Sequence, residues 1–179
     1  LYFSPEDNPV ISKMLPAIRN ARKSVLVLAN NLTQFSSGGS SDAIGDALLA
    51  AKNNGAIVEM IADDGYYNYG GSKSVINRLA NNGIDCRLVL NPSKVQSRLH
   101  SKTVIIDGEL IITGSANFTK NASELNDENQ IYIWNPQLAH EYMRNFRKII
   151  TPALARVQTP TFETTSPLPV TEITAAPQK

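Results

Sequence analysis

Runs of apolar residues separated by polar turn residues divide the first 150 residues into alternating strands and helices. Short runs rich in Val, Ile and Leu predict strands at 24–29, 56–62, 84–90, 99–106, 109–113 and 130–134, with a short edge strand at 2–4. Apolar residues at helical spacing predict helices at 9–18, 42–55, 74–82 and 136–150, with Pro16 interrupting the first. This order indicates an α/β fold, a mixed sheet with helices on both faces.

Two polar connections in this pattern are candidates for function. The loop 30–41 follows a buried strand and contains a Gly-Gly pair, so it either borders a binding site or is a flexible link. The stretch 63–73 is expected to be a second loop, and it carries three tyrosines, Tyr66, Tyr67 and Tyr69. Their rings either stack on nucleobases or pack across a dimer interface. We retain them as tentative substrate-binding residues.

The aspartate pair Asp63-Asp64 at the start of that stretch raises the question of a metal site. Carboxylates are common ligands of hard cations, but no histidine or further acid accompanies this pair in the sequence. We therefore expect no metal site and no cofactor.

The densest group of reactive side chains lies between residues 98 and 134. His100 and Lys102 are two residues apart on a predicted strand, so they share one face of it. An imidazole beside an ammonium suits phosphodiester chemistry, since histidine transfers protons near neutral pH and lysine stabilises anionic oxygens. Ser115 and Asn117 follow the returning strand and can donate hydrogen bonds to a phosphate.

The turn between these two strands is an Asp-Gly pair, Asp107-Gly108, which is a strong signal for a tight hairpin. Asp107 falls on the opposite face from His100 if the strand is regular. We therefore predict an orienting or structural role for Asp107, and also for Gly114. The second histidine of the chain, His140, lies in an amphipathic helical pattern and is predicted to be a surface residue.

These residues give the chain a resemblance to the phospholipase D superfamily, whose signature is H-x-K-x4-D-x6-G-S-x-N; every fixed position matches. The resemblance implies a phospholipase D-like α/β fold and a covalent phosphohistidine formed on His100. It also implies catalytic roles for Lys102, Ser115 and Asn117. Glu128 resembles the glutamate that hydrogen-bonds the catalytic histidine in this family, and Glu124 is a rival for that role. With a single motif, the chain resembles the nuclease-like, homodimeric branch of the superfamily. This implies an active site at a two-fold interface between two copies.

Composition narrows the choice of partner only slightly. The 179 residues include 17 basic and 16 acidic side chains, a formal net charge of +1. Affinity for nucleic acid would therefore come from a local patch, of which Arg98 is a tentative member. Cys86 is the only cysteine, which excludes an internal disulfide, and no stretch is long and apolar enough to predict an integral membrane segment.

The composition changes near residue 152, where Pro, Thr and Ser become dominant and apolar periodicity ends. We predict a catalytic domain over 1–151 and a tail or linker over 152–179. Two cellular locations stay open. The protein is either exported after removal of an upstream signal, or it is a cytoplasmic domain of a larger protein.

The phosphate-binding side chains and the lack of a metal-ligand cluster favour a metal-independent phosphodiesterase. The resemblance implies that it is an endonuclease that cleaves DNA in preference to RNA. Two alternatives stay open: a phospholipase D-type phospholipid hydrolase, and a nucleic-acid-binding module of a larger protein.

Overall fold

The computed structural model describes residues 1–37, 42–69, 71–90, 99–150 and 155–157. These residues form one mixed sheet of eight strands in the order β1-β7-β6-β5-β2-β3-β4-β8. The strands are β1 (Tyr2–Ser4), β2 (Ser24–Ala29), β3 (Ile57–Asp63), β4 (Asp85–Val89), β5 (Lys102–Ile106), β6 (Leu110–Gly114), β7 (Glu128–Trp134) and β8 (Ala155–Arg156).

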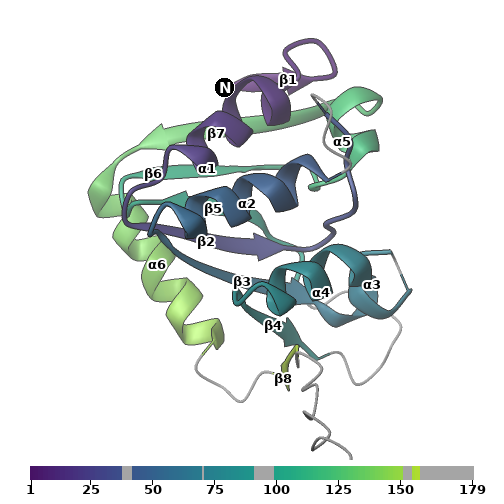
Figure 1. Cartoon of the computed structure of the whole chain (residues 1–179). Helices are drawn as coiled ribbons and strands as arrows, with labels where there is room; N and C mark the ends of the chain where they lie inside the picture. The colour runs from purple at the N-terminus through teal and green to yellow at the C-terminus, as the bar shows by residue number, and fades with distance from the viewer. Residues whose placement is uncertain (38–41, 70, 91–98, 151–154, 158–179) are drawn as a thin grey trace, which may run out of the picture.

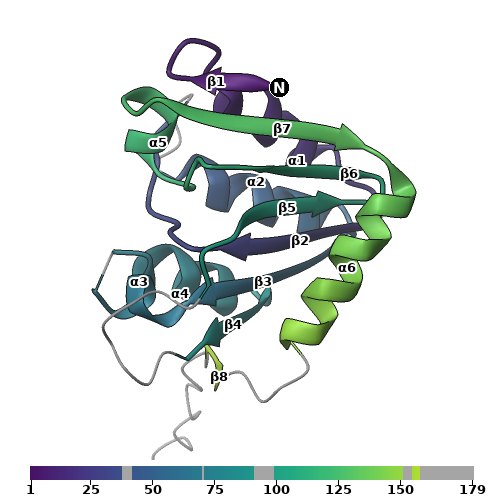
Figure 2. The ribbon, with the colours of Figure 1, turned by 180° about the vertical axis from the view of Figure 1, so that it is seen from behind.

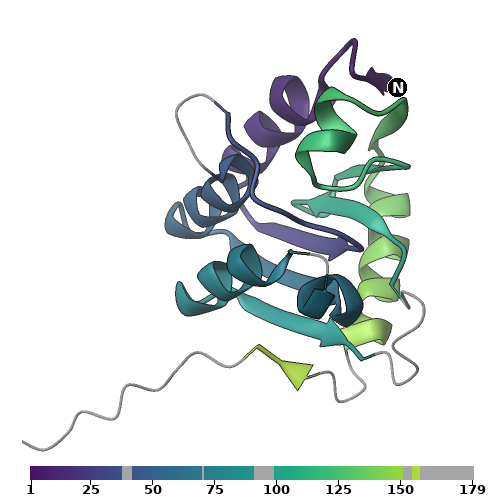
Figure 3. The same ribbon diagram turned by 90° about the vertical axis from the view of Figure 1, so that its right-hand side faces the viewer.

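Helices cover both faces of this sheet, which confirms the predicted fold class (Figures 1 and 2). The described helices are η1 (Val10–Met14), α1 (Leu15–Arg19), α2 (Ala43–Asn53), α3 (Asp64–Tyr69), α4 (Lys73–Asn81), α5 (Lys120–Glu124) and α6 (Pro136–Ile150). Figure 3 shows the three layers edge-on, with α1, α2 and α4 on one side of the sheet and α6 on the other.

The connections divide the sheet into a parallel and an antiparallel half. Strands β2, β3 and β4 are parallel neighbours, joined by crossovers that contain α2 and α4. Strands β5, β6 and β7 form an antiparallel meander, and β5 joins the two halves by pairing antiparallel to β2. The carboxyl ends of β2 and β3 therefore lie at the same edge of the sheet as the start of β5.

After Ser24, strand β2 is apolar, and both of its faces are buried. Val25 and Val27 pack into the core beneath the α1–α2–α4 layer, whereas Leu26 and Leu28 pack into the core beneath α6. Side chains alternate along a strand, so a continuous apolar run can serve both cores. In α6, Phe146 is fully buried against this second core.

The first helical region differs in detail from the single kinked helix that the sequence predicts. Residues Val10–Met14 form a π-helical turn in which the Leu15 N–H donates to the Val10 carbonyl. This turn leads directly into α1, where Pro16 occupies the first turn. Pro16 has no N–H to donate to the preceding turn, and the π-helical turn, with its wider i→i+5 hydrogen bond, lies directly before it.

The prediction that 63–73 is a loop is wrong, because residues 64–69 form α3. The side chain of Asp63 provides the local reason: its Oδ1 accepts hydrogen bonds from the N–H groups of Gly65 (3.0 Å) and Tyr66 (3.2 Å). Such bonds satisfy free N–H groups of the first helical turn. The sequence pattern also does not indicate the short helix α5, which Thr119 caps by accepting from Ala122 N at 3.3 Å.

The predicted strand 99–106 is shorter than expected and begins at Lys102. His100 consequently lies in an irregular segment just before β5. At the other end of the fold, the two-residue strand β8 pairs with β4. It lies just beyond residue 151, and the division into a domain and a tail stays a prediction.

Candidate active site at the ends of β2, β3 and β5

Lys102 is the most enclosed ionisable side chain of the predicted group. It pairs with Ala29, the last residue of β2, and only 7% of its surface is exposed. Its Nζ donates to the His100 carbonyl at 2.8 Å and to Asn30 Oδ1 at 3.4 Å. An ammonium has three N–H donors, and these contacts within the described residues use two of them.

Two opposing influences act on the pKa of Lys102. Burial lowers the pKa of its ammonium below the ordinary lysine value, because desolvation disfavours the charged form. The negative charge of Glu128 partly offsets this by raising the pKa of Lys102. Glu128 is the first residue of β7, so the carboxylate that raises the pKa of Lys102 comes from a different strand at the same edge of the sheet.

Gly114 sits at the end of β6 where the chain passes very close to β7. A Cβ at this position would lie 2.2 Å from the Asn129 carbonyl oxygen, and the backbone φ is +153°. The next residue, Ser115, is fixed by the same neighbour: its N–H donates to Asn129 O at 3.1 Å, and its Oγ accepts from Asn129 N at 3.0 Å. Glycine thus permits the approach that holds the exposed Ser115 in place.

The side-chain amide oxygen of Asn117 is buried without a hydrogen-bond partner in the described part of the chain. The adjoining Phe118 is tied to the stretch after β2, because Phe118 N donates to Asn31 O at 3.0 Å and Thr33 N donates to Phe118 O at 3.1 Å. The start of the loop 30–41 therefore does border the candidate site, as one of its two interpretations suggests.

Glu128 and its rival Glu124 both have local partners. Glu128 Oε1 accepts from Asn126 Nδ2 at 3.4 Å, and within the described part of the chain it makes no hydrogen bond to His100. Glu124 forms an ion pair with Lys120 one helical turn away, at 3.9 Å. The electrostatic influence of Glu128 on Lys102 is what distinguishes the two carboxylates.

Asp107 lies at the far end of β5 from Lys102, roughly 16 Å away at about 3.3 Å per strand residue. Its carboxylate accepts backbone N–H bonds from Arg22, Lys23 and Ser24 at 2.7–3.0 Å, and its φ is +56°. Burial would raise the pKa of Asp107, but these bonds and the charge of Lys23 outweigh it and hold the pKa below its usual value. The carboxylate ties the α1–β2 turn to the hairpin.

The tentative substrate-binding residues are only partly placed by the structure. Tyr66 and Tyr67 lie half-buried on α3, and the Tyr67 hydroxyl donates to Asn77 Oδ1 of α4 at 2.7 Å. That bond and packing against the core direct Tyr67 inward. Arg98 and the side chain of Tyr69 lie outside the described residues.

Both carboxylate oxygens of Asp63 accept hydrogen bonds from backbone N–H groups. One carboxylate oxygen caps α3, and the other accepts from Leu99 N at 3.1 Å. Within the described ranges, no group of three or more His, Cys, Asp or Glu side chains is arranged to hold a metal ion.

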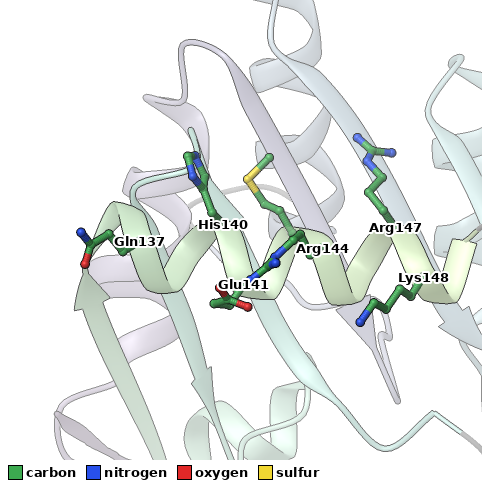
Figure 4. A pocket seen from close by; sticks show the side chains of 7 residues that line it. Gln137, His140, Glu141, Arg144, Arg147 and Lys148 are labelled. Atoms are coloured by element: carbon green, nitrogen blue, oxygen red, sulfur yellow. Dashed lines mark hydrogen bonds and ion pairs between the residues drawn. The ribbon is translucent and has the colours of Figure 1, made fainter.

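His140 belongs to a separate feature on α6. A surface groove of about 780 Å³ runs along this helix, lined by Gln137, His140, Glu141, Met143, Arg144, Arg147 and Lys148 (Figure 4). Arg144 pairs with Glu141, and Arg147 pairs with Glu59 of β3. His140 also lines a smaller hollow with Asp107 and Gly108, which places it at the opposite end of β5 from His100.

Comparison with known proteins adds independent information. A family model described as "Cardiolipin synthase, PLD-like domain" matches residues 14–150. The structure of the phospholipase D family member Nuc from Salmonella typhimurium superposes with a TM-score of 0.75 at 31% identity, covering 88% of this chain and 95% of Nuc. NucT from Helicobacter pylori shares the fold, with a TM-score of 0.67 at 19% identity over 83% of this chain and 92% of NucT.

Two curated relatives match a shorter region. A mitochondrial cardiolipin hydrolase from Chlamydomonas reinhardtii is 32% identical over 109 residues, which is 61% of this chain and 46% of the relative. A phospholipase D from Rickettsia conorii is 37% identical over 109 residues, or 60% and 52%. The aligned region thus spans about half the length of these relatives. No helix among the described residues is long and apolar enough to cross a membrane.

Proposed function

Because the chain belongs to the phospholipase D-like family, we propose that it is a metal-independent phosphodiesterase that cleaves DNA. The observation that carries this proposal is the buried ammonium of Lys102, bound to the His100 carbonyl; the contacts within the described residues use two of its three N–H donors. A fixed positive charge in a poorly hydrated position stabilises the charge that develops on phosphate oxygens. Ser115 and Asn117 approach from the end of β6 and would donate further hydrogen bonds.

The reaction takes two displacements. A nitrogen of His100 attacks phosphorus, and the bond from phosphorus to the leaving oxygen breaks as a proton reaches that oxygen. A water molecule then loses a proton to the same general acid-base group and displaces His100 from phosphorus. Splitting the reaction in this way is ordinary nucleophilic catalysis. The Lys102 charge takes the electrostatic role that a metal ion has in many nucleases.

The general acid on the far side of phosphorus is the remaining requirement. His140 cannot serve, because it lies at the other end of β5. We infer that a second copy of the chain supplies its own His100 across a two-fold axis, so that each dimer has one shared active site. One motif per chain and the exposed position of His100 support this arrangement.

Nucleic acid is favoured over lipid as the substrate because the apolar face of the amphipathic helix α6 packs against the sheet. Ala139, Phe146 and Ile150, which form its apolar face, are buried against the sheet and are not available to enter a membrane surface. DNA is therefore the substrate that we propose, with RNA as the related polymer to compare.

A second candidate, phospholipid hydrolysis, is favoured by two exposed apolar side chains near Glu128. Leu125 is 68% exposed and precedes Glu128 by three residues. Phe3 is 52% exposed and pairs with Asn129, the residue after Glu128. Such side chains could contact acyl chains. Leu125→Ser would then reduce hydrolysis of phospholipid vesicles and leave cleavage of a small phosphodiester unchanged.

One assay separates these functions. The purified protein is incubated in excess EDTA with DNA, RNA, phosphatidylcholine vesicles and bis-p-nitrophenyl phosphate. We expect cleavage of DNA at the same rate with and without EDTA, no cleavage by His100→Ala, and normal cleavage by the matched control His140→Ala. A requirement for magnesium, or full activity of His100→Ala, would refute the mechanism; hydrolysis of vesicles alone would establish the lipid alternative.

A further inference from the structure

The segment that carries His100 lies outside the regular sheet, so its conformation depends on contacts other than a strand ladder. Its neighbours Leu99 and Ser101 are held through their backbone groups by two residues distant in sequence. Asp63 Oδ2 accepts from Leu99 N at 3.1 Å, and Asn30 Nδ2 donates to Leu99 O at 2.9 Å. The N–H of Asn30 donates to Ser101 O at 2.9 Å.

Asn30 also reaches the other member of the catalytic pair. Its Oδ1 accepts from Lys102 Nζ at 3.4 Å, while its Nδ2 is bound to Leu99. A single amide thereby connects the backbone before His100 to the ammonium after it. The backbone of the same residue fixes Ser101, so both flanks of His100 are attached to Asn30.

Both side chains extend from the buried centre of the sheet. Asn30 directly follows β2, and Asp63 is the last residue of β3, which are the central parallel strands and are buried on both faces. Asn30 is 2% exposed and Asp63 is 1% exposed. Polar groups buried to this extent are held firmly in place by their hydrogen bonds, because leaving one unpaired is costly.

We propose that Asn30 and Asp63 are positioning residues that fix the His100 imidazole and the Lys102 ammonium relative to each other. Neither side chain touches the substrate; both act through the segment 99–102. The proposal rests on the proposed role of His100 and adds the residues that set its geometry. Asp63 also caps α3, so the same carboxylate joins the tyrosine-bearing helix to the catalytic segment.

The test compares Asn30→Ala and Asp63→Asn with the control Asn54→Ala. Asp63→Asn is nearly isosteric but replaces one of the two acceptor oxygens by an N–H donor. Asn54 is a suitable control because its Nδ2 also donates to a backbone carbonyl, that of Arg19 at 3.5 Å, next to α2 and outside the candidate site. Each protein is assayed for kcat and KM on DNA and by NMR of its histidine ring protons.

The two histidines make the NMR measurement internally controlled. The structure places His100 in the segment 99–102, which Asn30 and Asp63 hold, and His140 on α6 at the opposite end of β5. We expect Asn30→Ala and Asp63→Asn to shift or split the His100 resonance and to leave that of His140 in place. In the same variants kcat should fall roughly 10–100-fold, because small displacements of reacting groups cost about that much, and KM should change little.

Several results would overturn the proposal. These are a His100 resonance at its wild-type position in the folded variants, equal shifts of both histidines, or an unchanged kcat despite a shifted His100. If Asn30→Ala does not fold, the nearly isosteric Asp63→Asn decides by the same criteria. Absence of wild-type cleavage would instead refute the proposed function, and the two resonances would still show whether Asn30 and Asp63 fix His100.

Discussion

Replacing Gly114 by alanine tests the close approach of β6 and β7 on which the position of Ser115 depends. The new Cβ would lie 2.2 Å from the Asn129 carbonyl oxygen and 2.9 Å from its carbonyl carbon, so the backbone must move. Forcing an extra methyl group into a packed site costs typically 1–3 kcal/mol. The φ of +153° adds strain, since side chains rarely adopt it.

We therefore expect Gly114→Ala to lower the free energy of unfolding by about 2–4 kcal/mol. For a chain of this size each kcal/mol corresponds to roughly 2–4 °C in Tm, so the melting temperature should fall by about 4–16 °C. Activity measured well below the Tm should fall further than stability explains, because Ser115 moves with Asn129. The measurements are urea unfolding by circular dichroism and the initial rate of DNA cleavage.

Gly55→Ala is the matched control. Gly55 has a φ of +95° but nothing within 4 Å of the added Cβ, so only backbone strain contributes. Its expected cost is about 1 kcal/mol, with normal activity below the Tm. If Gly114→Ala is no less stable than Gly55→Ala and cleaves DNA normally, the argument that the approach to Asn129 requires glycine is wrong.

Three further predictions concern the shared site, the charge of Lys102 and the carboxylate of Asp107. When wild type and His100→Ala exchange subunits at random, activity should fall as the square of the wild-type fraction, because a mixed dimer lacks one histidine; a linear fall in the titration would exclude a shared site. Since burial lowers the pKa of Lys102 and Glu128 raises it, activity should decline at a pH below the ordinary lysine value of 10.5, and Glu128→Gln should move this decline to lower pH. If Glu128→Gln leaves the basic limb of the pH profile unchanged, Glu128 does not influence the pKa of Lys102. The pKa of Asp107 is depressed on folding, so its stabilisation is present above its unfolded pKa, near 3.8, and is lost as the pH falls through the folded pKa. Asp107→Asn should cost about 1–2 kcal/mol at pH 7 in urea unfolding, should reduce the acid dependence of stability, and should leave kcat within about two-fold; a large loss of kcat would contradict a structural role.

The sequence by itself determined the features that depend on local pattern. The period of apolar residues located the strands and the long helices, and the Asp107-Gly108 pair located the hairpin. The spacing from His100 to Asn117 was sufficient for the family resemblance, which the match over residues 14–150 confirms. These features were readable because strand alternation, helical spacing and turn chemistry are properties of neighbouring residues.

The tertiary structure decided how these features meet. Helix α3 forms where the sequence predicts a loop, because the side chain of Asp63 caps it. His100 lies before β5 rather than in it, and the contacts that hold its segment come from Asn30 and Asp63, 69 and 36 residues from Leu99. Such contacts depend on which strands become neighbours in the sheet, and a local pattern carries no information about strand order.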